Sequence, residues 1–409
     1  MNDENTRCAY DGEEYAQLSL VQLPVEMFLH ICSFLDASTL VHGLSLVCKQ
    51  FYLILSDDPL LHMWKARIDH ILPNASHSLL CLERPDKLFW KLSCVAIEKQ
   101  TALWGQQGSI KKLRFPHRYI NKTSVLLMPV DGITYLVGAN TCSLFCKKLS
   151  YREEPFYEVK HTKASYENCL TAIDRTVYIS RSDTVNSWVL TNTGLVHDRT
   201  YDPDIERSNR YDDLTCVSSY PERALFAAGS IYGTIYVFDS RSSNKPIYQY
   251  RPHTIYVTKL AMNTEYILST SKDQTVSVWD QRAGRTMKSI TIPGENVYPT
   301  YFDMRRDLVC VGDNKGKLHM LEPKNDFELV KSYSSYHTRE ITGVRLTHGC
   351  LITSSWDGTI RISCPTDPPK PITTIRLERE YISSMDYLND TLAIVGESLV
   401  VWRPRNRRV

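Results

Sequence analysis

The residue types of a catalytic relay occur twice in this chain, at the same spacing. The two sets are His253, Ser269 and Asp273, and His337, Thr353 and Asp357. A histidine beside a hydroxyl and a carboxylate can activate that hydroxyl as a nucleophile. Both sets, however, fall at equivalent places of a repeated strand-and-turn pattern. This placement favours a structural role, in which buried polar groups satisfy one another by hydrogen bonds.

Two glycine-containing segments are similar to known catalytic or nucleotide-binding motifs. Residues 312–318 (GDNKGKL) are similar to a phosphate-binding loop, but the segment is one residue short and no Ser or Thr follows Lys317. Residues 229–233 (GSIYG) place the serine one position too early for a nucleophile elbow. We interpret both as turns between strands. The 12 histidines show no HExxH or other ligand spacing. The sequence therefore predicts no catalytic residue, no metal site and no cofactor.

A pattern of short alternating strands recurs through the second part of the chain. It is clearest in residues 253–280, which end in Val278-Trp279-Asp280. The counterparts of Trp279 stand at intervals of roughly 40 to 50 residues, at Phe145, Trp188, Phe238, Leu321, Ser363 and Trp402. A repeat of this period with four strands per unit predicts a β-propeller, and the seven markers predict seven blades.

This repeat resembles the WD repeat. The buried hydrogen-bonded tetrad of that family is matched in the fourth blade by His253, Ser269, Asp273 and Trp279. The sixth blade departs from the pattern, with Ser363 where tryptophan is expected. Each marker follows three strands of its own blade, so too few residues remain after Trp402 for a fourth strand. Residues 109–115 alternate well, and we predict that they close the ring as the outer strand of the seventh blade.

The segment before the propeller, residues 22–64, has the pattern of four short helices. Pro24 suits the first position of a helix, and apolar residues follow at helical spacing. Asp36 or Ser38 can cap the second helix, and the last helix carries Trp64. Helices this short and apolar on more than one side cannot bury all of that surface among themselves. We predict a partner-binding face; the alternative is a helical cap packed on the next domain.

The order and spacing of this segment resemble the F-box. The resemblance is carried by LPVE at residues 23–26, the apolar run at 31–35, LVCKQF at 46–51 and Trp64. The F-box is the helical module by which an adaptor of the Skp type ties a substrate receptor to a cullin ubiquitin ligase. The resemblance implies that the adaptor is contacted by the residues at the apolar motif positions, which are Leu23, Pro24, Ile31, Leu35, Val47, Cys48 and Trp64.

In F-box/WD-repeat receptors, two kinds of loop lie together at one rim of the propeller. One kind joins the second and third strands of a blade, and the other leads into its first strand. The resemblance implies that a protein substrate binds there. The rim residues expected here are Arg181, Tyr232, Lys272, Asn314 and Trp356, and the matching first-strand residues are Thr171, Thr215, Thr258, Thr342 and Ser383. Isolated cations do not make a multi-arginine phosphate clamp, so we expect a mixed apolar and acidic ligand. The long insertion around residues 202–210 is expected over the same rim.

The overall composition is that of an ordinary globular protein, with 43% hydrophobic and 23% charged residues. The net charge of +2 gives no general attraction to nucleic acid or membranes. No run approaches the ~20 apolar residues of a membrane span, and no secretory signal is expected. The 12 cysteines lack paired CxxC spacing, which favours reduced thiols and a cytoplasmic or nuclear location.

We expect a mainly β protein in five parts. They are a disordered acidic N-terminus (1–19), an F-box (20–66), a helical linker (67–108), a seven-bladed WD-repeat propeller (109–403) and a basic tail (404–409). The resemblance implies a non-catalytic substrate-recognition subunit of a cullin-type (SCF) ubiquitin ligase, with a Skp-type adaptor, a cullin and a protein substrate as partners. No nucleic acid, membrane or small-molecule substrate is expected. The alternative is a WD-repeat scaffold that assembles protein complexes without ubiquitin transfer.

Overall fold

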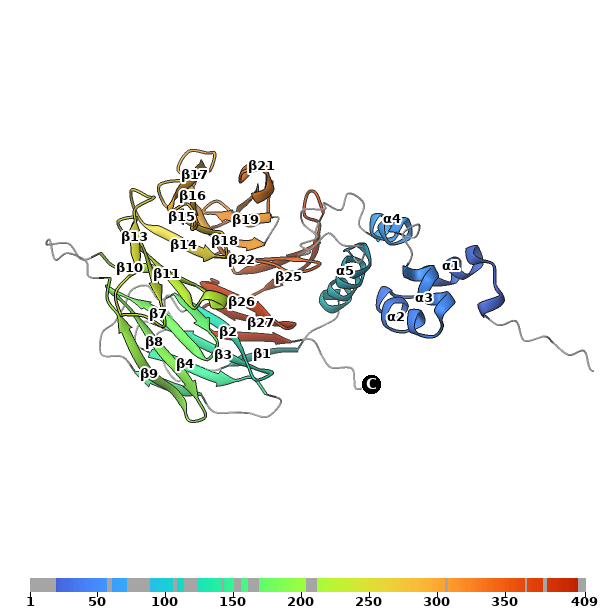
Figure 1. Cartoon of the computed structure of the whole chain (residues 1–409), viewed down its shortest axis with the longest axis horizontal. Coiled ribbons are helices and arrows are strands. Elements are labelled where there is room, and N and C mark those ends of the chain that lie inside the picture. The colour runs from blue at the N-terminus through green and yellow to red at the C-terminus, as the bar shows by residue number, and fades with distance from the viewer. Residues whose placement is uncertain are drawn as a thin grey trace, which may run out of the picture.

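A ring of antiparallel sheets with a group of helices at one side makes up the protein (Figure 1). The computed structural model describes residues 20–56, 61–71, 89–105, 109–113, 124–140, 143–150, 156–160, 169–203, 212–305, 308–364, 366–377 and 381–403. Several expected features lie outside the described residues, namely the acidic N-terminus (1–19), the basic tail (404–409), and residues 204–210 of the long insertion.

The helical module precedes the propeller. Its elements are η1 (Leu20–Gln22), α1 (Val25–Ser33), α2 (Ala37–His42), η2 (Leu44–Leu46), α3 (Lys49–Ser56) and α4 (Leu61–Ile71), followed by the longer helix α5 (Phe89–Gly105). Pro24 is the N-cap of α1, and its carbonyl accepts a hydrogen bond from the Phe28 N–H at 3.0 Å. Of the two predicted caps of the second helix, Asp36 is the one used, because its carboxylate accepts the Thr39 N–H at 2.8 Å.

The propeller consists of seven four-stranded sheets. Blade one contains β2 (Ser124–Val130), β3 (Ile133–Ala139), β4 (Ser143–Lys148) and β5 (Tyr157–Lys160). Blade two contains β6 (Leu170–Ile173), β7 (Thr176–Arg181), β8 (Thr184–Thr191) and β9 (Gly194–Tyr201). Blade three contains β10 (Leu214–Tyr220), β11 (Leu225–Ser230), β12 (Ile235–Asp239) and β13 (Tyr248–Tyr250). Blades four and five are formed by β14 (Val257–Met262), β15 (Tyr266–Ser271), β16 (Thr275–Asp280) and β17 (Arg285–Thr291), and by β18 (Pro299–Arg305), β19 (Leu308–Asp313), β20 (Lys317–Glu322) and β21 (Glu328–Ser334). Blade six contains β22 (Ile341–Leu346), β23 (Leu351–Ser355), β24 (Thr359–Ser363) and β25 (Pro371–Arg376), and blade seven contains β26 (Ser384–Leu388), β27 (Thr391–Val395), β28 (Leu399–Arg403) and β1 (Ser109–Leu113). Short 3-10 turns follow β10 (η5, Pro221–Arg223) and β20 (η6, Pro323–Asn325).

The strand order confirms the predicted number of blades and the predicted closure. Every marker residue of the repeat lies on the third strand of its blade, from Phe145 on β4 to Trp402 on β28. Strand β1 pairs antiparallel with β28, with Ile110 opposite Trp402. The ring is thus closed by joining the start of the propeller sequence to its end, which leaves neither end of the ring unpaired.

Buried apolar clusters fill the spaces between neighbouring blades. One cluster joins Val125 and Phe145 of the first blade to Ala393 and Val401 of the seventh. The packing leaves little space, as Gly343 of β22 shows, because a Cβ atom there would lie 2.5 Å from the Met385 side chain of the next blade. Close packing of this kind fixes each blade against its neighbours.

Candidate binding sites of the helical module and the propeller

Helix α5 joins the helical module to the propeller. On the module side, the Glu98 carboxylate accepts the backbone N–H of Ala37 at 2.7 Å and the Arg67 Nε–H at 2.6 Å. The Arg67 guanidinium also donates to the carbonyl of Cys32 at 3.2 Å. These bonds connect α1, α2 and α4 to α5, and buried Ile97 of α5 belongs to the core cluster of the module. The module and the linker helix therefore share one core.

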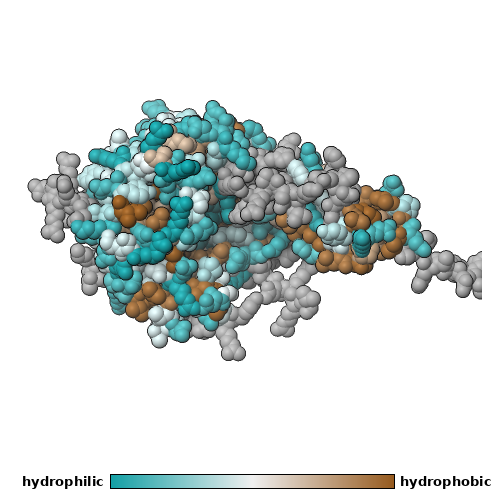
Figure 2. Space-filling model, viewed as in Figure 1, coloured by the Kyte–Doolittle hydropathy of each residue, from teal (hydrophilic) through white to brown (hydrophobic). Residues whose placement is uncertain are grey.

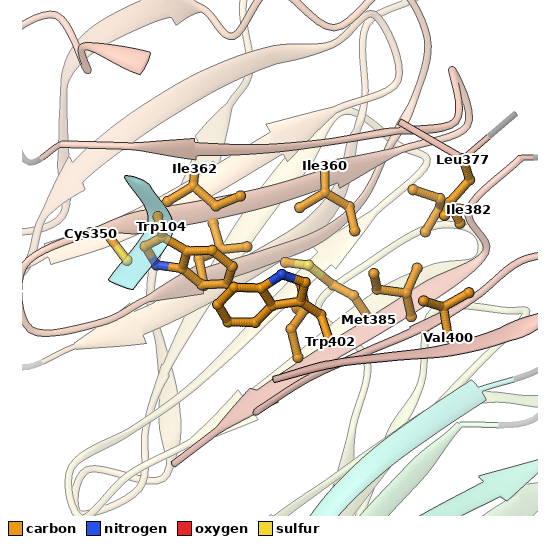
Figure 3. Packing of buried hydrophobic residues seen from close by; sticks show 12 residues of the cluster. Trp104, Cys350, Ile360, Ile362, Leu377, Ile382, Met385, Val400 and Trp402 are labelled. Atoms are coloured by element: carbon orange, nitrogen blue, oxygen red, sulfur yellow. The ribbon is translucent and has the colours of Figure 1, made fainter. Parts of the chain in front are cut away.

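On the propeller side, α5 contacts the turns that join the first and second strands of blades six and seven. The Trp104 ring stacks on the Trp402 ring, with centroids 4.2 Å apart (Figure 3). Lys99 Nζ lies 2.9 Å from an Asp390 carboxylate oxygen. Gly349 has φ +107°, and a Cβ there would lie 2.9 Å from the backbone of Ala96. A glycine is thus required where the turn meets the helix.

The surface of the helical module carries an uncovered apolar face. Its members come from η1, α1, η2 and α3 and from the residues directly after α1 and η2, and they are Leu20, Val21, Val25, Met27, Ile31, Phe34, Leu46, Val47, Tyr52 and Leu53. Phe34 is 78% exposed and Leu46 is 73% exposed. Figure 2 shows apolar atoms gathered over this module, whereas the visible propeller surface is mostly polar. Apolar area concentrated in this way is characteristic of a protein interface.

The residues predicted to contact the adaptor differ in their exposure. Pro24, Ile31 and Val47 are exposed, and Leu23, Leu35 and Cys48 are half-buried. Trp64 is only 3% exposed, and its indole N–H donates to the Leu55 carbonyl at 3.3 Å. Its large apolar ring is buried in the core of the module, so the expectation of a surface contact at Trp64 is wrong. Phe34 and Leu46 were missed; the signal that could have found them is their position opposite the buried residues of the short helices.

The two relay-like sets are buried in the blades. His253 is hydrogen-bonded to Ser269 Oγ at 2.8 Å and to Asp273 Oδ2 at 3.1 Å. Burial would raise the pKa of Asp273, but the hydrogen bonds from His253 and Thr275 outweigh it and hold that pKa below its usual value. Ser269 is 1% exposed, so its hydroxyl is closed to a substrate. The Trp279 ring, the fourth member of the set, stacks on the Tyr250 ring with centroids 3.7 Å apart.

The sixth blade repeats this arrangement, and the fifth blade has a different one. His337 bonds to Thr353 Oγ1 at 2.9 Å and to Asp357 Oδ2 at 3.1 Å, as the sequence predicts for a structural set. In the fifth blade, His319 on the third strand bonds to Asp313 at 3.0 Å and to Ser332 at 2.8 Å. Sequence reasoning missed this set, because its histidine lies on the third strand and not before the first strand.

A channel runs between the first strands of the blades and forms a cavity of about 460 Å³. All five first-strand hydroxyl residues predicted from the sequence line it. Some of these hydroxyls connect one blade to the next. Thr215 Oγ1 donates to the Val257 carbonyl at 2.6 Å, and Thr258 Oγ1 donates to the Pro299 carbonyl at 2.9 Å. They are therefore used in holding the ring together.

Charged residues of the channel wall connect three blades. Arg345 Nε lies 3.0 Å from Asp386 Oδ1, and Arg345 Nη1 lies 3.7 Å from Asp303 Oδ1. Each carboxylate also accepts a backbone N–H from the next blade. Asp386 accepts that of Leu127 at 2.7 Å, and Asp303 accepts that of Leu346 at 2.8 Å. The attraction of both carboxylates outweighs burial and raises the pKa of Arg345 above its usual value.

The predicted rim residues differ in their exposure. Trp356 is 47% exposed, and its ring centroid is 5.9 Å from that of Tyr381. Lys272 is exposed, and its Nζ lies 4.2 Å from the centroid of the Tyr256 ring. Arg181 stands at the end of β7, before the turn to β8, but its side chain is only 8% exposed and lies within 3.5 Å of the Asn140 carbonyl.

The remaining two rim residues are half-buried parts of their turns. Asn314 accepts the Tyr298 N–H at 3.1 Å and donates to the Asn296 carbonyl at 3.0 Å. The backbone N–H of Tyr232 donates to Asp212 at 3.3 Å. Of the five predicted rim residues, Lys272 of blade four and Trp356 of blade six are thus the exposed ones. Within the described ranges, no cluster of three His, Cys, Asp or Glu side chains could hold a metal ion, and no helix is long and apolar enough to cross a membrane.

Comparison with known families agrees with this architecture. The F-box-like family matches residues 20–64, and the family described as WD domain, G-beta repeat matches residues 244–280. This is an F-box/WD-repeat architecture. The resemblance of the chain to F-box/WD-repeat proteins is confirmed, and so is the mainly β fold with a helical F-box-like module before seven blades.

F-box/WD-repeat relatives match almost the whole chain. F-box/WD repeat-containing protein 9 of Homo sapiens is 25% identical over 97% of this chain and 85% of its own length, and that of Bos taurus is 24% identical over the same shares. The WD repeat-containing protein 89 homolog of Dictyostelium discoideum is 31% identical over 33% of this chain and 37% of its own length. A chain from the crystal structure of the mitotic checkpoint complex aligns with a TM-score of 0.61 and 13% identity, over 73% of this chain and 91% of that chain, which shows the fold alone.

Proposed function

We propose that this F-box/WD-repeat protein is the non-catalytic substrate-recognition subunit of a cullin-type ubiquitin ligase. The observation that carries the proposal is the uncovered apolar face of the helical module, on which Phe34, Leu46 and Val47 are the most exposed apolar side chains. A monomer rarely leaves a patch of this kind uncovered, and here it lies on the segment that matches the F-box. A Skp-type adaptor is the partner that this module takes in the family.

In the proposed activity, the protein positions a bound substrate relative to the bound adaptor. Helix α5 shares a core with the helical module and stacks on the propeller, so the two binding regions are held in a fixed relation. The α5 contacts involve turns between the first and second strands, whereas Lys272 and Trp356 lie at the opposite ends of their blades. A substrate held at that rim and an adaptor held by the module are therefore kept apart, which leaves room for the enzyme that transfers ubiquitin.

The test is affinity purification of the tagged full-length chain from cells, read by mass spectrometry. We expect a Skp-type adaptor and a cullin with the wild-type chain, and loss of both with Val47→Asp. Val330→Asp is the matched control, since Val330 is 50% exposed on propeller strand β21. Both substitutions are at exposed positions, so the melting temperature is expected to stay close to that of the wild type.

If Val47→Asp recovers the adaptor and the cullin at the wild-type level, the apolar face is not the adaptor-binding site. Absence of a cullin from the wild-type purification would instead favour the alternative, a propeller scaffold that assembles protein complexes without ubiquitin transfer.

A further inference from the structure

The described part of the channel wall carries two cations, and they differ in their partners. Arg345 is engaged by the carboxylates of Asp303 and Asp386. Lys259, on β14, has no carboxylate oxygen within 4.0 Å among the residues that the structure describes. Its Nζ lies instead 4.0 Å from Cys169 Sγ and 4.5 Å from the centroid of the Tyr301 ring.

These neighbours place the Lys259 ammonium inside the ring and not against its own blade. Cys169 precedes the first strand of blade two, and Tyr301 lies on the first strand of blade five. The ammonium therefore projects from blade four into the channel, where it meets residues of blade two and of the neighbouring blade five. A thiol and an aromatic ring give it only weak electrostatic compensation. A positive charge in a cavity with protein walls attracts an anion more strongly than the same charge on an open surface.

The same cavity reaches the rim. Tyr256 and Trp356 line it together with Lys259, and Trp356 is 47% exposed at the opening. The cavity of about 460 Å³ has the size of ordinary ligand pockets. An extended chain can thus place an apolar side chain against Trp356 or Tyr256 while an acidic group next to it reaches the ammonium below.

The surrounding charges favour a carboxylate over a phosphate. Lys259 offers one positive charge, and Glu340 lies at the rim of the same cavity. Asp303 and Asp386 line the same cavity and pair with Arg345. Because Arg345 balances these two carboxylates in part, the single charge of Lys259 suits a carboxylate monoanion better than a phosphate dianion.

We propose that the channel mouth binds an acidic peptide segment whose unphosphorylated carboxylate pairs with Lys259 and whose apolar neighbour packs on Trp356. This inference rests on the proposed function, because the segment would belong to the protein substrate of the ligase. The carboxylate can be supplied by an Asp or Glu side chain or by the C-terminus of the peptide.

The first experiment selects binders from a random peptide library displayed on phage, with the purified full-length chain as the bait. We expect enrichment of peptides in which an acidic residue, or the free C-terminus, lies near an aromatic or aliphatic residue. Synthetic versions then serve as probes in fluorescence anisotropy, with the acidic side chain changed to Gln, the same position changed to phosphoserine, or the C-terminus amidated. These arms distinguish the two sources of the carboxylate.

The variants are Lys259→Met, Lys259→Arg and the control Lys324→Met, which removes an exposed lysine of η6 at the end of blade five away from the channel mouth. We expect Lys259→Met to weaken binding about tenfold or more, as the loss of a buried charge partner does. Lys259→Arg should retain most of the affinity, and Lys324→Met should bind like the wild type. Melting temperatures of all variants establish that they are folded.

The proposal is overturned if the selected peptides are not acidic, if Lys259→Met binds them like the wild type, or if phosphoserine binds at least tenfold more tightly than the acidic residue. Its failure can be told apart from that of the proposed function. Peptide binding is measured on the purified chain without adaptor, whereas the ligase assignment depends on the adaptor and cullin recovered from cells.

Discussion

Trp104, at the end of helix α5, stacks on Trp402 of strand β28 with the two rings inclined by only 21°. Trp402 lies on the strand that pairs with β1 and so closes the propeller. The stack therefore joins the linker helix to the seam where the ring is closed. Both rings are buried in a cluster that also contains Ile360 and Val400 of blades six and seven (Figure 3).

Trp104→Ala is expected to lower the free energy of unfolding by roughly 3–5 kcal/mol, because it removes a large buried ring and leaves a cavity. Denaturant unfolding followed by circular dichroism measures the loss. Trp356→Ala is the matched control, since the Trp356 ring is 47% exposed and should cost far less. Equal losses in the two variants would contradict the assigned role of the Trp104–Trp402 stack.

Glu98→Gln tests the junction between the module and α5. The Glu98 carboxylate accepts bonds from Arg67 and from the N–H of Ala37, and its neutralisation should cost about 1–3 kcal/mol. We expect limited proteolysis of the full chain to become faster as the module separates from α5. Lys99→Met, which removes an exposed ion pair, should cost only about 0–1 kcal/mol. An unchanged cleavage rate in Glu98→Gln would show that the Glu98 carboxylate does not hold the module to α5.

Asp386→Asn tests the charged connection between blades. Asp386 is 3% exposed and pairs with Arg345 while accepting the N–H of Leu127. Removing one partner of such a pair should cost about 3–5 kcal/mol, as measured by thermal or denaturant unfolding. The control is Asp239→Asn, which affects a surface pair with Arg241 and should cost at most about 1 kcal/mol.

The stability of the propeller is expected to depend on pH through His337. Burial lowers the pKa of His337 from 6.5, and Arg361 acts in the same direction, whereas the Asp357 carboxylate partly opposes the shift. The unfolded chain therefore takes up the proton at a higher pH than the folded chain. The stabilising contribution is complete above pH 6.5 and is lost as the pH falls through the folded value.

For this single proton the slope can reach about 1.4 kcal/mol per pH unit. Denaturant unfolding of the wild type and of His337→Gln between pH 5 and pH 7.5 measures it, and the variant should show a smaller decrease on acidification. The pKa of Asp357 is lowered from 3.8, so its own contribution is lost only at more acidic pH, outside this window. Parallel pH profiles for the two proteins would exclude His337 as the source.

Most of the architecture can be predicted from local sequence patterns. The interval between Trp279 and its counterparts gives the number of blades, because each blade is built from one continuous segment. The missing strand after Trp402 and the alternating residues from Ser109 onward give the closure, because sheet edges require pairing. The hydrogen-bonded sets around His253 and His337 follow from the same repeat, since equivalent turns bring equivalent side chains together.

The exposure of single side chains was decided only by the tertiary structure. Trp64 and Arg181 stand at positions that the family pattern assigns to surfaces, yet their large side chains are buried by neighbouring helices or blades. The pairing of Lys259 with Cys169 and Tyr301 likewise leaves no signal in the sequence, because the channel is assembled from first strands contributed by all seven blades. The sequence by itself thus determined the repeat, its closure and its helical module, since these depend on short-range periodicity. The tertiary structure decided which residues face a partner, since that depends on contacts between segments far apart in the chain.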